Sequence, residues 1–108
     1  MSSPGRDKAF ASVARAFSRD QRVTVGDGKG FGAGGLKVDG KLFAMVSSRG
    51  QFVVKLPKDR VRAIVEQGDG EFFNTGGGRL MREWVAMDGG EARWLSLATE
   101  ARQFVGGA

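Results

Sequence analysis

The sequence predicts a single α+β domain, residues 1–108, in which an antiparallel meander of four to five strands packs with an N-terminal, a middle and a C-terminal helix. Three observations support this fold class. The 108 residues supply material for about one hydrophobic core. Alternating apolar segments joined by short turns fill the centre of the chain, which is typical of antiparallel strands. Segments with apolar residues at helical spacing lie before and after these strands.

The N-terminal helix is expected within residues 6–19. Four apolar side chains in this segment follow the spacing i, i+3, i+4 and i+7, which places them on one stripe of a helix: Phe10, Val13, Ala14 and Phe17. Ser3, followed by Pro4, suits an N-cap and a first helical turn. The β-branched residues 22–25 (RVTV) then form a candidate first strand.

The central strands are predicted from two turn signals. Residues 36–38 (LKV) run into Asp39-Gly40, a strong two-residue hairpin signal, and residues 41–48 form the returning strand. Arg49-Gly50 is expected to form a second tight turn into residues 51–56. These segments predict a three-stranded antiparallel meander.

The two turns decide which side chains share a face, because a slip of one residue reverses the faces of a strand. If both turns have two residues, one face is apolar throughout and holds Leu36, Val38, Phe43, Met45, Phe52, Val54 and Leu56. The other face is mixed and holds Lys37, Leu42, Ala44, Val46, Gln51, Val53 and Lys55. A three-residue turn at 48–50 would scramble this partition, so the agreement favours the tight turn. The mixed face would need partial cover from a helix or a partner.

The second half of the chain predicts two helices around one more strand. Pro57 opens a short helix that carries Val61, Ile64 and Val65 and ends at Gly68. Residues 68–78 are expected to form a loop, with both of its phenylalanines pinned to the core. Residues 82–87 (REWVAM) predict a strand, and Asp88-Gly89-Gly90 a turn. The last helix, about 91–105, has helical spacing at Trp94, Leu97, Ala98, Ala101 and Phe104.

The composition argues against an enzyme. The chain contains no histidine, cysteine or tyrosine, whereas a general base near neutral pH is most often histidine and a nucleophilic serine or cysteine usually depends on one. Zinc sites are built mainly from cysteine and histidine, and the acidic residues are spread without a calcium-loop pattern. We therefore expect no catalytic residues, no cofactor, no metal and no small-molecule substrate.

The glycines at positions 30, 32 and 35 satisfy the spacing G-x-G-x-x-G, which cradles phosphates in dinucleotide-binding folds. In those folds a helix follows the glycines, and its N-terminal amides hold the pyrophosphate. Here the alternating residues 36–38 follow instead, so a strand is expected. We interpret the segment as a glycine-rich connection rather than a nucleotide loop.

No apolar run approaches the roughly 18 residues needed to span a bilayer, and the first ten residues lack the apolar stretch of a secretory signal. We therefore expect a cytoplasmic protein without a membrane partner. The formal net charge is +5, and it is unevenly distributed. Residues 26–62 carry eight bases against three acids, whereas residues 63–108 carry four against seven. Such asymmetry is typical of a surface that contacts nucleic acid.

A family resemblance adds to this interpretation. The run FGAGGLKVDGKLFAMV (31–46), then VVKLP, EFF and GGGRLMREWVAM (76–87), followed by WLSLATEARQFV (94–105), resembles the TfoX N-terminal domain family, and more distantly the MmcQ/YjbR-like proteins. The similarity covers about residues 31–105 in the order of the family. The chain departs from it in having no tyrosine. The resemblance implies a curved antiparallel sheet, a role in competence regulation, and DNA binding rather than catalysis.

The expected interaction surface consists of five basic residues: Lys37, Lys41, Arg49, Lys55 and Arg79. Lys55 stands out because it sits in an otherwise apolar strand, so its amine must reach an exposed face or a partner. Trp84 and Trp94 are interpreted as core anchors. The resulting hypothesis is a non-catalytic regulatory domain that makes weak, salt-sensitive contacts with the backbone of a nucleic acid. The alternative is a protein-interaction adaptor that uses the mixed sheet face and binds no nucleic acid.

Overall fold

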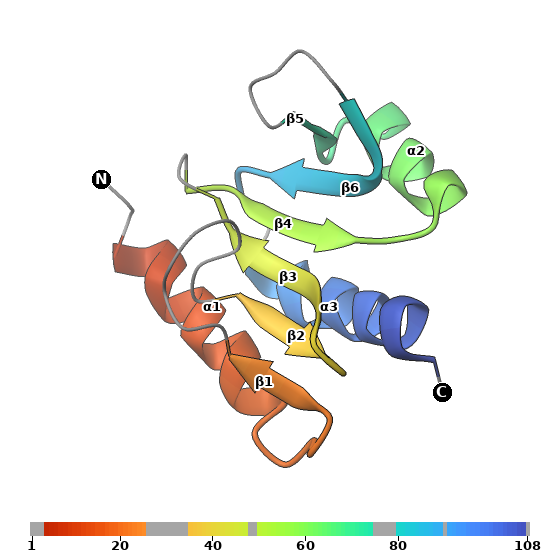
Figure 1. Cartoon of the computed structure of the whole chain (residues 1–108). Helices are drawn as coiled ribbons and strands as arrows, with labels where there is room; N and C mark the ends of the chain where they lie inside the picture. Colours follow the sequence, from red (N-terminus) through yellow and green to blue (C-terminus); the bar gives the residue numbers. More distant parts are fainter. Residues whose placement is uncertain (1–3, 26–34, 48–49, 75–79, 90, 108) are drawn as a thin grey trace.

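The computed structural model describes residues 4–25, 35–47, 50–74, 80–89 and 91–107. Ser3, Arg49, Arg79 and most of the glycine-rich connection (26–34) lie outside these residues. The described part of the chain forms three helices and six strands (Figure 1). In chain order they are α1 (Pro4–Ala16), β1 (Val23–Val25), β2 (Leu36–Val38), β3 (Lys41–Val46), β4 (Phe52–Lys55), α2 (Lys58–Glu66), β5 (Glu71–Asn74), β6 (Leu80–Met87) and α3 (Glu91–Gly106).

The six strands form one antiparallel sheet in the order β1-β2-β3-β4-β6-β5. This confirms the α+β class and the meander. The expected number of four to five strands was too small, because residues 71–74 pair with β6 as an edge strand instead of forming a loop. Gly35 is buried and leads directly into β2, so a strand follows the glycine-rich connection, as the sequence predicted.

The three helices share one hydrophobic core with one face of the sheet. Val13 of α1, Val61 and Ile64 of α2, and Trp94 and Leu97 of α3 belong to the same buried cluster. Aromatic rings connect these helices to the strands. The Phe10 and Phe52 ring centroids are 6.2 Å apart, those of Phe17 and Phe43 are 5.6 Å apart, and those of Phe52 and Trp94 are 4.5 Å apart. The helices therefore form one layer and the sheet the other.

A second, smaller apolar cluster lies on the sheet face opposite the helices. It consists of Met45, Val53, Phe73, Trp84 and Ala86, with Leu42 packed against it. We call this side of the sheet the open face. No member of the cluster is more than 8% exposed. The prediction that Trp84 and Trp94 are core residues is confirmed, with Trp94 in the helix-side core and Trp84 in the open-face cluster.

The register corrects the predicted faces at the third strand. Leu36 lies opposite Ala44 while Lys37 lies opposite Leu42, so β3 contains one extra residue, a β-bulge. Beyond the bulge the alternation reverses. Ala44 therefore joins the helix-side core and Met45 turns to the open face, opposite to the prediction for both.

The second turn also differs from the prediction. Ser47 donates its backbone N–H to the carbonyl of Gln51 at 2.8 Å, so three residues, 48–50, connect the strands instead of two. Gly50 has φ +79°, the left-handed conformation that favours glycine at the end of such a loop. The first turn is confirmed, because both of its central residues, Asp39 (φ +53°) and Gly40 (φ +81°), are left-handed, as in a type I′ hairpin.

The helix limits agree with the sequence to within a few residues. Pro57 occupies the N-cap position of α2, and Gly68 beyond its end has φ +79°. The first helix ends at Ala16, three residues earlier than expected, and a turn follows.

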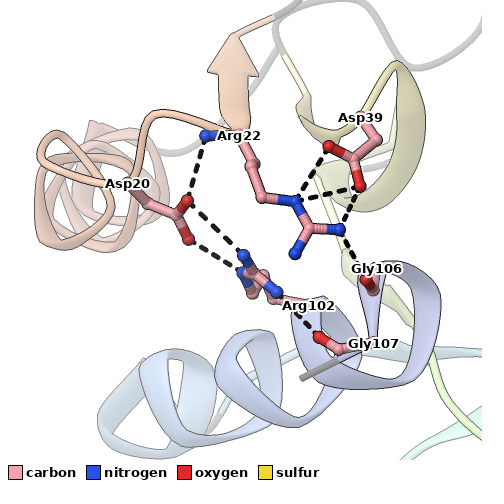
Figure 2. Close-up of polar contacts among 6 residues, drawn as sticks. All are labelled: Asp20, Arg22, Asp39, Arg102, Gly106 and Gly107. Atoms are coloured by element: carbon pink, nitrogen blue, oxygen red, sulfur yellow. Dashed lines mark hydrogen bonds and ion pairs between the residues drawn. The ribbon is translucent and has the colours of Figure 1, made fainter.

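A network of charged side chains links the turn before β1 and the β2–β3 hairpin to the C-terminal end of α3 (Figure 2). Arg22 forms an ion pair with Asp39 in the first hairpin and donates from Nη2 to the carbonyl of Gly106 at 2.6 Å. Arg102 of α3 donates from Nε to Asp20 at 2.8 Å. The hydrogen bond from Arg102 lowers the pKa of Asp20, and the one from Arg22 lowers the pKa of Asp39.

Candidate anion-binding surface

The antiparallel topology gathers cations at one end of the sheet. Strands β2 and β4 end, and β3 and β6 begin, at the same end of the antiparallel sheet, and α2 follows β4 there. These segments carry seven basic residues, of which Arg60 forms an ion pair with Glu100. We call the other six the basic end: Lys37, Lys41, Lys55, Lys58, Arg62 and Arg82. The first three were predicted from the sequence, and the other three were not.

Lys37 and Lys55 share the open face, as the register argument predicted. Lys37 lies between the helix-side core residues Leu36 and Val38, so it points to the other face, where its strand partner Leu42 packs. Lys55 is paired with Trp84 of the open-face cluster. Two strand spacings separate β2 from β4, about 10 Å.

Trp84 positions the amine of Lys55. The Lys55 Nζ lies 5.8 Å from the centroid of the Trp84 ring, within the range of a cation–π contact. This answers the question raised by a lysine in an apolar strand. The residue is half-exposed, so its ammonium group reaches the surface beside the indole ring.

The other predicted residues do not join this pair. Lys41 is exposed but pairs with Val38, so it belongs to the opposite face of the sheet at the same end. Arg49 and Arg79 lie outside the described residues.

A cleft of about 280 Å³ adjoins the basic end, between α2 and β6. Of the residues that the structure describes, Lys58, Arg62, Phe72 and Arg82 line it. Lys58 and Arg62 are one helical turn apart on α2, and this spacing was visible in the sequence. Arg82 was not predictable in this role, because only the packing of β6 on α2 brings it to the helix.

The cations of the basic end form no ion pair within the part of the chain that the structure describes. The four ion pairs there use other arginines: Arg22 with Asp39, Arg60 with Glu100, Arg93 with Asp69, and Arg102 with Asp20. Two further acids, Asp59 and Glu83, lie near the basic end without forming an ion pair in that part of the chain. An excess of positive charge therefore remains at this end.

Among the described residues, acids outnumber bases at the opposite end of the sheet. Glu71 starts β5 and Asp88 follows β6, and both accept hydrogen bonds from the buried Gln51 amide, at 2.9 and 3.4 Å. They line an open hollow of about 470 Å³ together with Asp69 and Arg93, which form an ion pair. Among the residues described, no group of three or more acidic side chains is arranged to hold a metal ion.

Comparison of the chain with protein-family models, curated proteins and solved structures finds no match. None of the helices in the described ranges is long and apolar enough to cross a membrane. The resemblance to the TfoX N-terminal domain family stays a prediction.

Proposed function

We propose that this protein is a non-catalytic regulatory domain of the TfoX N-terminal type that contacts the phosphate backbone of a nucleic acid through its basic end. The observation that carries the proposal is the group of six cations with no ion pair among the described residues, which lie at one end of the sheet and on the adjoining α2. Unpaired lysine and arginine side chains are the groups that neutralise phosphates.

The geometry favours backbone contact over base recognition. Lys37 and Lys55 project from a sheet face, about 10 Å apart, and Lys55 is held over an indole ring. Binding to a duplex is therefore expected to be indifferent to sequence.

The absence of histidine, cysteine and tyrosine from the whole chain supports a non-catalytic role. An adaptor that binds protein through the mixed sheet face is the second candidate. It is ranked lower because the apolar cluster on that face is at most 8% exposed and offers little accessible apolar surface.

The test is fluorescence anisotropy on a labelled 20-base-pair duplex. The variant Lys37→Glu/Lys55→Glu is expected to lose most of the binding at low salt. The control Arg15→Glu/Arg19→Glu makes the same change in net charge at exposed residues of α1 and the turn after it, and it should weaken binding much less. Circular dichroism checks that both variants fold. Equal effects of the two variants, or no binding by the parent protein, would reject the proposal.

A further inference from the structure

The cleft between α2 and β6 is lined by cations and by an aromatic ring. Contact with the phosphate backbone of a nucleic acid alone does not require the aromatic ring. Lys58, Arg62 and Arg82 are exposed, whereas Phe72 is half-buried, packs against the helix-side core and also belongs to the lining. The sheet pairing is irregular at this point. Phe72 lies opposite Val85, whereas Phe73 lies opposite Met81, so β6 has three extra residues between the two pairs. Arg82 is one of them and lines the cleft beside α2.

We propose that this cleft binds one nucleotide unit, with the base against Phe72 and the phosphate among Lys58, Arg62 and Arg82. This proposal rests on the proposed function and makes it more specific, because the cleft is expected to prefer a nucleoside phosphate whose base is unpaired. The source is either a nucleotide within a single strand or a free nucleotide, and both share this chemistry.

The residue types suit both parts of such a ligand. Two guanidinium groups and an ammonium group are the side chains best suited to a phosphate, and arginine can donate two parallel hydrogen bonds. Stacking of a base on an aromatic ring is tolerant of sequence. The volume of about 280 Å³ is close to the lower limit for small-molecule sites, which fits a single nucleotide rather than a larger ligand.

The first turn of α2 carries Lys58 and one acid, Asp59, and its N-cap Pro57 makes no side-chain capping hydrogen bond. Two acidic residues of α2, Asp59 and Glu66, are exposed, but neither lines the cleft or forms an ion pair in the described part of the chain. The three lining cations are thus available to a ligand.

The experiment compares a labelled five-nucleotide single strand with the same phosphate backbone lacking its bases, by fluorescence anisotropy. Loss of the bases is expected to weaken binding about tenfold, the effect of one stacking contact. Phe72→Leu should weaken binding of the natural strand by a similar factor and leave the abasic strand unchanged. Arg82→Gln should weaken binding of both strands. Thymidine monophosphate added as a competitor reports whether a free nucleotide occupies the same cleft.

Phe104→Leu is the matched control, because Phe104 is a partly exposed phenylalanine of α3, 38% accessible, and does not line the cleft. Should Phe72→Leu fail to fold, nuclear Overhauser contacts between the Phe72 ring and base protons in the parent protein give the same information.

The inference and the proposed function fail in different ways. Equal affinity for natural and abasic strands, with no contact between Phe72 and a base, rejects the nucleotide cleft. The backbone function then survives if the duplex still depends on Lys37 and Lys55. If neither the duplex nor the single strand binds, both are rejected.

Discussion

The ring of Phe52 in β4 lies parallel to the indole of Trp94 in α3, with 4.5 Å between centroids and 8° between ring planes. Both side chains are fully buried, and the indole nitrogen donates to the carbonyl of Gly89 at 3.0 Å. This stack joins the centre of the sheet to the helix layer, so Trp94 contributes both apolar contact and a satisfied polar group.

Trp94→Ala is expected to destabilise the domain by about 3–5 kcal/mol, through lost contacts and a cavity beneath the sheet. Leu95→Ala, at the adjacent but 44% exposed position, should cost less than about 1 kcal/mol. Urea unfolding followed by circular dichroism measures both. A small effect of Trp94→Ala would mean that the stack is not part of the core in solution.

Acid is expected to weaken the fold through the network in Figure 2. Hydrogen bonds from Arg102 and Arg22 lower the pKa values of Asp20 and Asp39 below the ordinary 3.8. The folded protein therefore binds these protons less readily than the unfolded chain does. This contribution to stability is complete above the ordinary pKa and is lost as pH falls through 3.8 toward the folded-state values.

The measurement is the urea midpoint between pH 7 and pH 3, for the parent and for Asp20→Asn/Asp39→Asn. The variant should be less stable at pH 7 and show a smaller decline in acid, because its amides do not titrate. Asn is suited to the left-handed backbone at position 39. Parallel curves for the two proteins would contradict this assignment.

Gly70 is expected to tolerate no side chain. A Cβ there would lie 2.9 Å from Val85 Cγ2 and 3.0 Å from the carbonyl oxygen of Ala86, and a backbone atom in a paired strand cannot move away easily. We expect Gly70→Ala to cost about 1–3 kcal/mol through overpacking. Gly89→Ala is the control, since a Cβ at Gly89 has no neighbour within 4 Å. Thermal unfolding of both variants tests this expectation. Equal midpoint temperatures for the two variants would show that the chain at Gly70 does not approach β6 this closely.

Salt is expected to weaken duplex binding in proportion to the phosphates contacted. If Lys37, Lys55 and Arg82 each meet one phosphate, the slope of log affinity against log salt should be about −3. Lys55→Gln should make the slope shallower by about one. A slope near zero in the parent protein would indicate that binding does not use these cations.

Most of the fold was predictable because local signals agreed with the final packing. Asp39-Gly40 predicted the first hairpin, and Pro57 and Gly68 predicted the two ends of α2. The helical spacing of apolar residues around Trp94 predicted α3. Residues 71–74 were missed as a strand because the glycines on both sides of them are typical of a loop.

The register shows how two local errors can leave the core almost unchanged. No residue type in β3 signals its bulge, and the glycine at position 50 is compatible with either a two-residue or a three-residue loop. Each feature shifts the alternation by one residue. The shifts cancel, so Phe52 and Val54 still face the helices as predicted, and only the end of β3 was assigned to the wrong faces.

The candidate surface was less predictable than the fold. Lys37 and Lys55 were placed together because strand alternation alone determines their face. The cleft beside them depends on how α2 packs against β6 and on an irregularity within the β5–β6 pair, and neither is encoded in a short motif.

The separation of charge along the strands has a kinetic consequence. Among the described residues, the cations of the basic end lie at one end of the sheet and Glu71 and Asp88 at the other, which separates charge along β4. If the protein binds a nucleic acid as proposed, the field of that polyanion would turn the basic end toward it before the surfaces touch. Productive encounters would then become more frequent without any additional contact in the complex. Ionic strength should accordingly change the rate of association more than the rate of dissociation.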